Sequence, residues 1–231
     1  MTPTPIIRGV WVASAAGTSD LTEDNVAALN AIDGVNRAAV YEVIPRTPEE
    51  QERSRTRVDH LDEVPGPQPT ALILTEWESL RPCVHAEEAL RKLPVEREEP
   101  GRTVVNRSVF ARVSSVFGKH DSEYPDFGPN IQLGQFNMPT HDSEFDLSVW
   151  YEDQRLEPFS QLDGVIRASR LSSIVGPTKF GVLYELTSRE AHLAFIANLE
   201  ERAHDPNDEM GRVVRKTIHS WLSPAFAQRV L

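Results

Sequence analysis

The sequence has one cysteine, no long hydrophobic run and few basic residues, and each shortage excludes a class of protein. Cys83 stands alone, so a disulfide within the chain is excluded and a reducing, cytoplasmic location is expected. No apolar run approaches the roughly 20 residues of a membrane span, so no membrane partner is expected. Residues 1–17 lack a basic region and Arg8 interrupts their apolar run, which argues against a signal peptide.

Positive charge is scarce, with 24 Lys and Arg against 35 Asp and Glu and a net charge of −11. Nucleic acid is not expected as a partner, because phosphate binding needs a basic face. The chain also lacks a glycine-rich phosphate loop and a Gly-x-Ser-x-Gly elbow, which argues against nucleotide-binding and acyl-hydrolase classes. The acidic surface is interpreted as serving solubility.

Metal-binding patterns are missing as well. None of the seven histidines has a second histidine four residues away, as a helical metal site requires. His85-Ala86-Glu87 has no Cys-x-x-Cys to complete a zinc site, and we interpret it as a solvated helix face. Cys83 is interpreted as a buried small hydrophobe, with a reactive nucleophile as the alternative. The sequence therefore predicts no metal and no cofactor.

An internal repeat organises the chain. Ile32-Asp33-Gly34-Val35-x-Arg37-Ala38 matches Leu162-Asp163-Gly164-Val165-x-Arg167-Ala168, and both predict a helix, a tight Asp-Gly turn and a strand. A second match aligns Gly101-Arg102-Thr103-Val104 with Gly211-Arg212-Val213-Val214, each at the expected start of a fourth strand. The spacing between matches differs because the polar segment 45–69, either a lid or a loop, belongs to the first half alone.

The pattern predicts an α+β fold of two β-α-β-β-α-β units, the ferredoxin-like order. The repeats are expected at residues 1–117 and 131–231, with a linker at 118–130. Two such sheets bury their open faces against each other, which gives a pseudo-two-fold, dimeric-type α/β barrel within one chain. The expected strands are 6–13, 35–44, 71–77, 102–115, 131–137, 165–172, 179–186 and one beginning near 211. The expected helices are 22–31, 78–93, 146–161 and 187–201.

The second half carries a family resemblance. Its residues fit a helix with Trp-Tyr, a turn and an Arg-bearing strand: Phe145, Trp150, Tyr151, Leu156, Asp163-Gly164-Val165 and Arg167. The closing stretch 216–230 resembles the Thr-x-His, Ser-Pro, Arg-Ile tail of tandem bacterial members. The chain thus resembles EthD-like dimeric α/β-barrel proteins, covering the second half well and the first half only through the repeat.

The resemblance implies a fold more than an activity. The superfamily includes cofactor-free cyclases, dehydratases, isomerases and monooxygenases acting on aromatic or polyketide-like molecules, together with haem enzymes and many proteins of unknown role. The helix histidine of the family falls on Arg155, and Asn25 is the equivalent in the first half. This chain therefore cannot use a mechanism that depends on that histidine. A haem enzyme is a third alternative, because some members of the superfamily bind haem.

Three histidines are candidates for proton transfer. His120 and His141 each precede an aspartate in loops around the first strand of the second half. His219 lies in the expected last strand, where it would face the barrel interior. Each has a structural alternative: a solvated loop residue for His120 and His141, and a satisfied buried histidine for His219.

Further candidates bind charge or substrate. Arg167 and its repeat equivalent Arg37 would bind a carboxylate or enolate, or else form an ion pair with a helix carboxylate, which their recurrence favours. Trp150 and Tyr151 point about 100° apart on a helix, so one is expected to pack on the sheet and the other to line a cleft. The substrate-binding candidates are Trp150, Tyr151, Arg155, Gln135, Asn137 and Tyr184, with Gln135 and Asn137 on one strand face.

The leading hypothesis is a cofactor-independent lyase, dehydratase, cyclase or isomerase acting on an aromatic or polyketide-like substrate. A histidine would transfer the proton and Arg167 would stabilise negative charge, with the second half as the active half. The alternative is a non-catalytic ligand-binding or accessory protein, which the arginine at position 155 supports. The chain is expected to be a monomer, since the repeat supplies its own partner, or a homodimer through a sheet edge.

Overall fold

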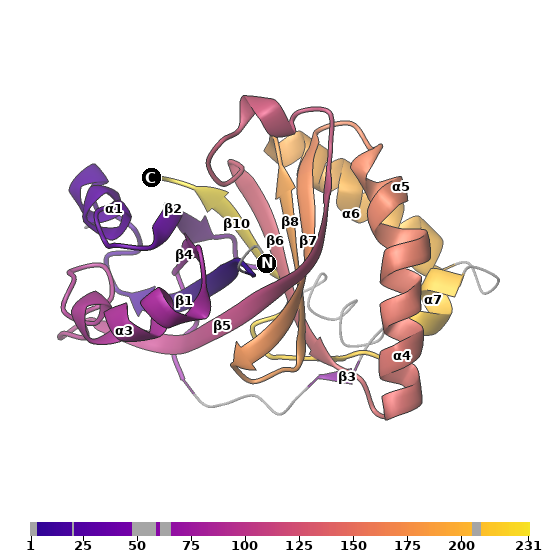
Figure 1. Ribbon diagram of the computed structural model, residues 1–231, viewed down its shortest axis with the longest axis horizontal. Coiled ribbons are helices and arrows are strands. Elements are labelled where there is room, and N and C mark those ends of the chain that lie inside the picture. Colours follow the sequence, from indigo (N-terminus) through magenta and orange to yellow (C-terminus); the bar gives the residue numbers. More distant parts are fainter. Residues whose placement is uncertain (1–3, 20, 48–58, 61–65, 205–208) are drawn as a thin grey trace.

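The computed structural model describes residues 4–19, 21–47, 59–60, 66–204 and 209–231 (Figure 1). The first half contributes four long strands: β1 (Ile6–Ser14), β2 (Val35–Val43), β4 (Ala71–Trp77) and β5 (Arg102–Phe117). The second half contributes four more: β6 (Asn130–Asn137), β7 (Val165–Val175), β8 (Phe180–Leu186) and β10 (Ala225–Arg229). Two short strands, β3 (Asp59–His60) and β9 (Ile218–His219), pair in parallel beside β6.

The eight long strands close into an antiparallel barrel. Their order is β10-β2-β4-β1-β5-β7-β8-β6, and β6 returns to β10. Strand order within the first half is β2-β4-β1-β5, and within the second it is β7-β8-β6-β10. The β5–β7 and β2–β10 pairings join the halves, so one chain supplies both seams of the barrel.

Helices cover the outer face of each half (Figure 1). The first half carries α1 (Glu23–Asn30) and α3 (Leu80–Leu90). The second half carries α4 (His141–Trp150), a π turn named η2 (Tyr151–Arg155), α5 (Leu156–Ser160), α6 (Arg189–His204) and α7 (Glu209–Val214). A short 3-10 turn, η1 (Asp121–Glu123), lies between the halves. Within the described residues, no helix combines the length and apolar character needed to cross a bilayer.

The strands place alternate side chains inside the barrel and under the helices, which produces three hydrophobic clusters. The interior cluster includes Ile7, Trp11, Tyr41, Leu74, Phe110, Leu133, Leu171 and Leu183. A second cluster lies under α1 and α3 and includes the buried Cys83. The third, which we call the helical layer of the second half, lies between its helices and the sheet and is rich in aromatic rings.

The Asp-Gly turns of the repeat have a shared steric cause. Gly34 and Gly164 both adopt positive φ, at 85° and 75°. A Cβ added at Gly34 would lie 2.6 Å from Cβ of Pro82, and one at Gly164 would lie 2.4 Å from Cβ of Ala191. Only glycine fits both the backbone conformation and the close approach of the helix.

Two expectations about the second half are wrong, and a third, the helix at 146–161, is confirmed with an interruption. Residues 211–214 lie in α7, not in a strand, because Val213 is buried in the helical layer; the last strand is β10. The expected loop before residue 146 is the first part of α4, where Thr140 caps the helix by accepting from the Ser143 N–H over 3.2 Å. The helix expected at 146–161 is divided by η2. Most of segment 45–69 lies outside the described residues.

Candidate functional site

The site begins at η2, which places Arg155 beneath the helices. Pro158 has no N–H and cannot donate to the carbonyl of Gln154, four residues earlier, so a regular α-helix cannot continue through this point. The chain widens instead, and the N–H of Leu156 donates to the carbonyl of Tyr151, five residues back. Turns of this kind are frequent at functional sites. Here Arg155 is directed inward and is only 2% exposed.

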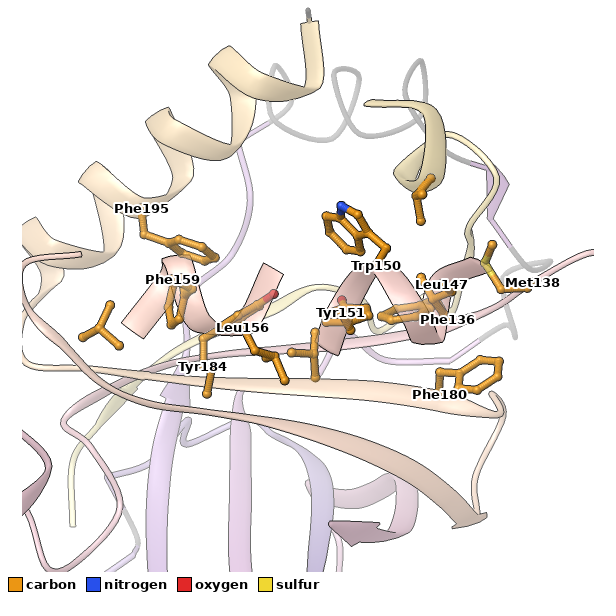
Figure 2. Close-up of a cluster of buried hydrophobic side chains, with 14 of the residues drawn as sticks. Phe136, Met138, Leu147, Trp150, Tyr151, Leu156, Phe159, Phe180, Tyr184 and Phe195 are labelled. Carbon is orange, nitrogen blue, oxygen red and sulfur yellow. The ribbon is translucent and has the colours of Figure 1, made fainter. Parts of the chain in front are cut away.

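Aromatic rings surround the Arg155 guanidinium. Its Nε donates to the hydroxyl of Tyr184 over 3.2 Å. Its Cζ lies 5.4 Å from the ring centres of Tyr184 and Phe159, and 5.3 Å from that of Phe195. Figure 2 shows these three rings gathered from β8, α5 and α6. Cation–π attraction of this kind offsets part of the cost of burying the charge.

Two buried donors in this layer lack acceptors. Arg155 Nη2 and Trp150 Nε1 have no hydrogen-bond partner among the described residues. Trp150 packs edge-on against Tyr151 at 4.9 Å between ring centres, and Tyr151 is stacked with Phe136 at 6.3 Å (Figure 2). A buried donor left unpaired is costly, so this layer favours a ligand that carries hydrogen-bond acceptors.

The Tyr151 hydroxyl in the layer stays protonated. Burial, together with a hydrogen bond to Tyr184, raises the pKa of Tyr151 well above its usual range. Tyr151 is therefore a donor and not a base at neutral pH. With the Arg155 cation beside it, the arrangement can stabilise negative charge on an oxygen atom.

Arg167 and Arg37 lie elsewhere, in an ion network at one end of the barrel interior. Arg37 pairs with Glu76 at 2.8 Å and Glu185 at 3.3 Å, and Arg167 lies 3.6 Å from Glu185 and 3.0 Å from Asp121. Their partners include the strand residues Glu76 and Glu185, which lie directly across the sheet from Arg37 and Arg167 respectively. The ion-pair alternative had assumed carboxylates on helices, and that part of it is wrong. This network holds the linker, whose Asp126 carbonyl accepts from Arg37 over 3.0 Å.

The three candidate histidines are not brought together. His120 lies 3.0 Å from Glu123 beside η1. The side chain of His141 is 98% exposed in the first turn of α4, not in a loop, and lies 3.4 Å from Glu144. His219 lies in β9, not in the last strand, and packs on Phe136 at 5.8 Å between ring centres, so it adjoins the helical layer and not the barrel interior. Of these three histidines, His219 is the one that lies beside the cluster that contains Tyr151.

Gln135 and Tyr184 lie on opposite faces of the sheet, so the expected grouping of Gln135, Asn137 and Tyr184 is wrong. Tyr184 is paired across the sheet with Gln132, an odd number of residues from Gln135, and alternation turns the two side chains apart. Gln135 accepts from Ser108 over 3.3 Å inside the barrel. Asn137 accepts from the Lys179 N–H over 2.7 Å at the end of its strand.

Sequence reasoning missed His192, Phe159 and Phe195. The spacing of residues 192, 195 and 196 on one helix face could have indicated that His192 is buried. Burial and the neighbouring Arg189 lower the pKa of His192 to about 4, so it is neutral at pH 7. Its Nε2 lies 3.4 Å from Gln132 Oε1 and its Nδ1 3.4 Å from Arg189 Nη1. With both nitrogens engaged, His192 does not fit an axial haem ligand.

Cys83 matches the structural interpretation of the sequence. It lies on the buried face of α3, and burial raises the pKa of its thiol to about 11. A thiol that is neutral at pH 7 and shielded from solvent is a poor nucleophile. Within the described ranges, no three metal-ligating side chains come together.

Solved structures with similar folds place this architecture among known barrels. An anthrone oxidase-like protein superposes with a TM-score of 0.60 at 13% identity over 100% of this chain and 92% of its own. The putative chlorite dismutase TA0507 superposes with a TM-score of 0.58 at 10% identity, over 99% of this chain and 96% of its own. A mutant chlorite dismutase from Candidatus Nitrospira defluvii superposes with a TM-score of 0.55 at 8% identity, over 100% of this chain and 92% of its own. The fold is that of a dimeric α/β barrel. No protein-family model and no curated protein sequence matches the chain.

Proposed function

We propose that the chain is a cofactor-independent, cytoplasmic small-molecule enzyme whose active site is the helical layer of the second half. The proposal includes tandem duplication of a ferredoxin-like unit and membership of the EthD-like group, supported by the equivalent Arg37–Glu76 and Arg167–Glu185 positions. The observation that carries the function is Arg155, a buried cation with an unpaired nitrogen among aromatic rings. An aromatic or polyketide-like substrate that develops negative charge on oxygen suits this environment.

In the proposed reaction, a base removes a proton from the substrate and the charge moves onto an oxygen atom. Arg155 donates to that oxygen through Nη2, in the role that the sequence had suggested for Arg167. His219 is the proposed base, because it is the candidate histidine that packs beside Phe136 and Tyr151. Water is kept out by the surrounding rings, which strengthens the attraction between the cation and the forming oxyanion.

Untargeted mass spectrometry of a metabolite extract, before and after incubation with the purified protein, tests the proposal. A feature that falls as another rises establishes an enzyme, and the mass difference separates a dehydratase from an isomerase. Replacing the true base with alanine should lower the rate by roughly 10²–10⁴-fold. Unchanged turnover in the single alanine variants of His120, His141 and His219 would contradict histidine-mediated proton transfer.

The second candidate function is a non-catalytic binding protein. It is favoured by one observation: Arg155 occupies the position where the sequence resemblance places a histidine, and the described side chains nearest its guanidinium are aromatic rings without a base. A metabolite that co-purifies unchanged with the protein would support this candidate over the enzyme.

A further inference from the structure

Arg155 differs from the other buried arginines of the described chain. Arg8 lies 2.5 Å from Glu96, Arg37 lies 2.8 Å from Glu76, and Arg102 lies 3.5 Å from Glu99. Arg155 is buried to a similar degree, yet no carboxylate in the described chain lies within 4 Å of it. A buried cation without a counter-ion is strongly disfavoured, so its retention points to an anion that this chain does not supply.

The surroundings of Arg155 limit that anion to one charge. The hydrophobic residues of its layer carry no charge, and the buried His192, which stacks on Phe195 and contacts Arg189, is neutral at pH 7. The nearby Arg170 is already paired with Glu152 at 3.0 Å. A phosphate ester or dicarboxylate would bring a second negative charge, and Arg155 alone would have to balance both. An amino acid would bring an ammonium group that finds no carboxylate there. Both classes are disfavoured by the cost of an unpaired buried charge.

The hydrogen bonds of Arg155 also limit the shape of the anion. A carboxylate prefers two adjacent guanidinium nitrogens in a bidentate fork. Here Nε already donates to Tyr184, and Nη2 is the buried nitrogen without an acceptor. The bond to Tyr184 therefore occupies the side-on fork through Nε and Nη2. A single charged oxygen can be bound by Nη2 alone, and the unpaired Trp150 Nε1 offers a donor for a further acceptor on the same molecule.

We infer that the helical layer of the second half selects the phenolate or enolate form of a flat, otherwise apolar molecule over its neutral form. This inference rests on the proposed function for the location of the site, but it concerns the charge of the bound molecule and not its turnover. Because Arg155 is 2% exposed, the helical layer must open to admit the molecule, and association should be slow.

Absorbance of coloured phenols provides the test, since their phenolate band reports charge directly. 4-Nitrophenol and a larger nitronaphthol are titrated with the intact protein at pH values below their own pKa. The wild-type protein should increase the phenolate band, which means that binding lowers the pKa of the probe. Arg155→Met should reduce phenolate affinity on the order of 10- to 100-fold, the loss of one charge-assisted hydrogen bond. Arg170→Met is the matched control and should behave as wild type.

Other outcomes would overturn the inference. These are binding of the neutral phenol without a phenolate band, equal binding by Arg155→Met, or no binding of either phenol. Arg155→Gln, a polar neutral side chain, provides a second variant if methionine disturbs the layer. A protein that binds phenolate but converts no metabolite would contradict the proposed enzyme and leave the inference standing. Turnover of a metabolite by a protein that binds only the neutral phenol would contradict the inference and leave the proposed enzyme standing.

Discussion

Arg155 and Tyr184 are joined by a 3.2 Å hydrogen bond between the π turn and β8, and this bond fixes the direction of an otherwise unpaired cation. Nε is held by the tyrosine hydroxyl, so Nη2 is left to face the layer without an acceptor. This geometry supports the anion site proposed above, in which the protein bears the cost of a buried charge before the ligand arrives.

The first prediction follows from that cost. Arg155→Met removes an unpaired buried charge while retaining an apolar chain of similar length, so it should raise the free energy of unfolding of the ligand-free protein by about 1–2 kcal/mol. Urea denaturation followed by circular dichroism measures the change. A clear decrease in stability would show that the bond to Tyr184 and the ring contacts outweigh the cost of burying the charge.

Arg37→Met should have the opposite sign. Although burial lowers the pKa of Arg37, Glu185 and Glu76 raise it above its usual value, which shows how strongly the pairs hold the charge. Removing the cation leaves Glu76 with Arg112 and Glu185 with Arg167, so the free energy of unfolding should fall by up to about 3–5 kcal/mol. The same urea experiment applies, and equal effects of the Arg37 and Arg155 variants would refute the distinction between paired and unpaired arginines.

His192 should make the free energy of unfolding decrease in acid. Its pKa is about 4 in the folded protein against the ordinary 6.5, so the unfolded chain binds the extra proton first as the pH falls. The contribution of neutral His192 to the free energy of unfolding is fully present above pH 6.5. It is lost progressively as the pH falls to about 4, and the total loss is about 3 kcal/mol. His192→Gln, measured at pH 7 and pH 4.5, should show a smaller decrease than wild type; identical slopes would contradict the assignment.

Gly164→Ala tests the turn shared by the repeat positions. The substitution combines a φ of 75° with a Cβ placed 2.4 Å from Ala191, and should lower the free energy of unfolding by about 2–4 kcal/mol. Gly17 is the matched control, because its φ is 64° but nothing lies within 4 Å of an added Cβ. Gly17→Ala should lose only the backbone component, about 1–2 kcal/mol. Equal losses in thermal or urea unfolding would show that the contact with α6 is unimportant.

The candidate site was only partly predictable from the sequence. Trp150, Tyr151, Arg155 and Tyr184 were predicted to bind substrate and do lie in one layer, because the helix and the strand that carry them are locally recognisable. Gln135 fell on the other face, since one residue of strand register decides the side of a sheet. Phe159 and Phe195 were missed because aromatic residues on a helix are ordinary core residues until their neighbours are known.

The sequence by itself determined the long strands that form the barrel, apart from the last, as well as the Asp-Gly turns and the acidic surface. These depend on local periodicity, on the unique conformational range of glycine and on composition. Tertiary structure alone decided that 211–214 is helical and that Arg167 has carboxylate partners while Arg155 has none. Pairing of a buried charge depends on groups distant in the chain, and a local pattern carries no information about which of them it meets.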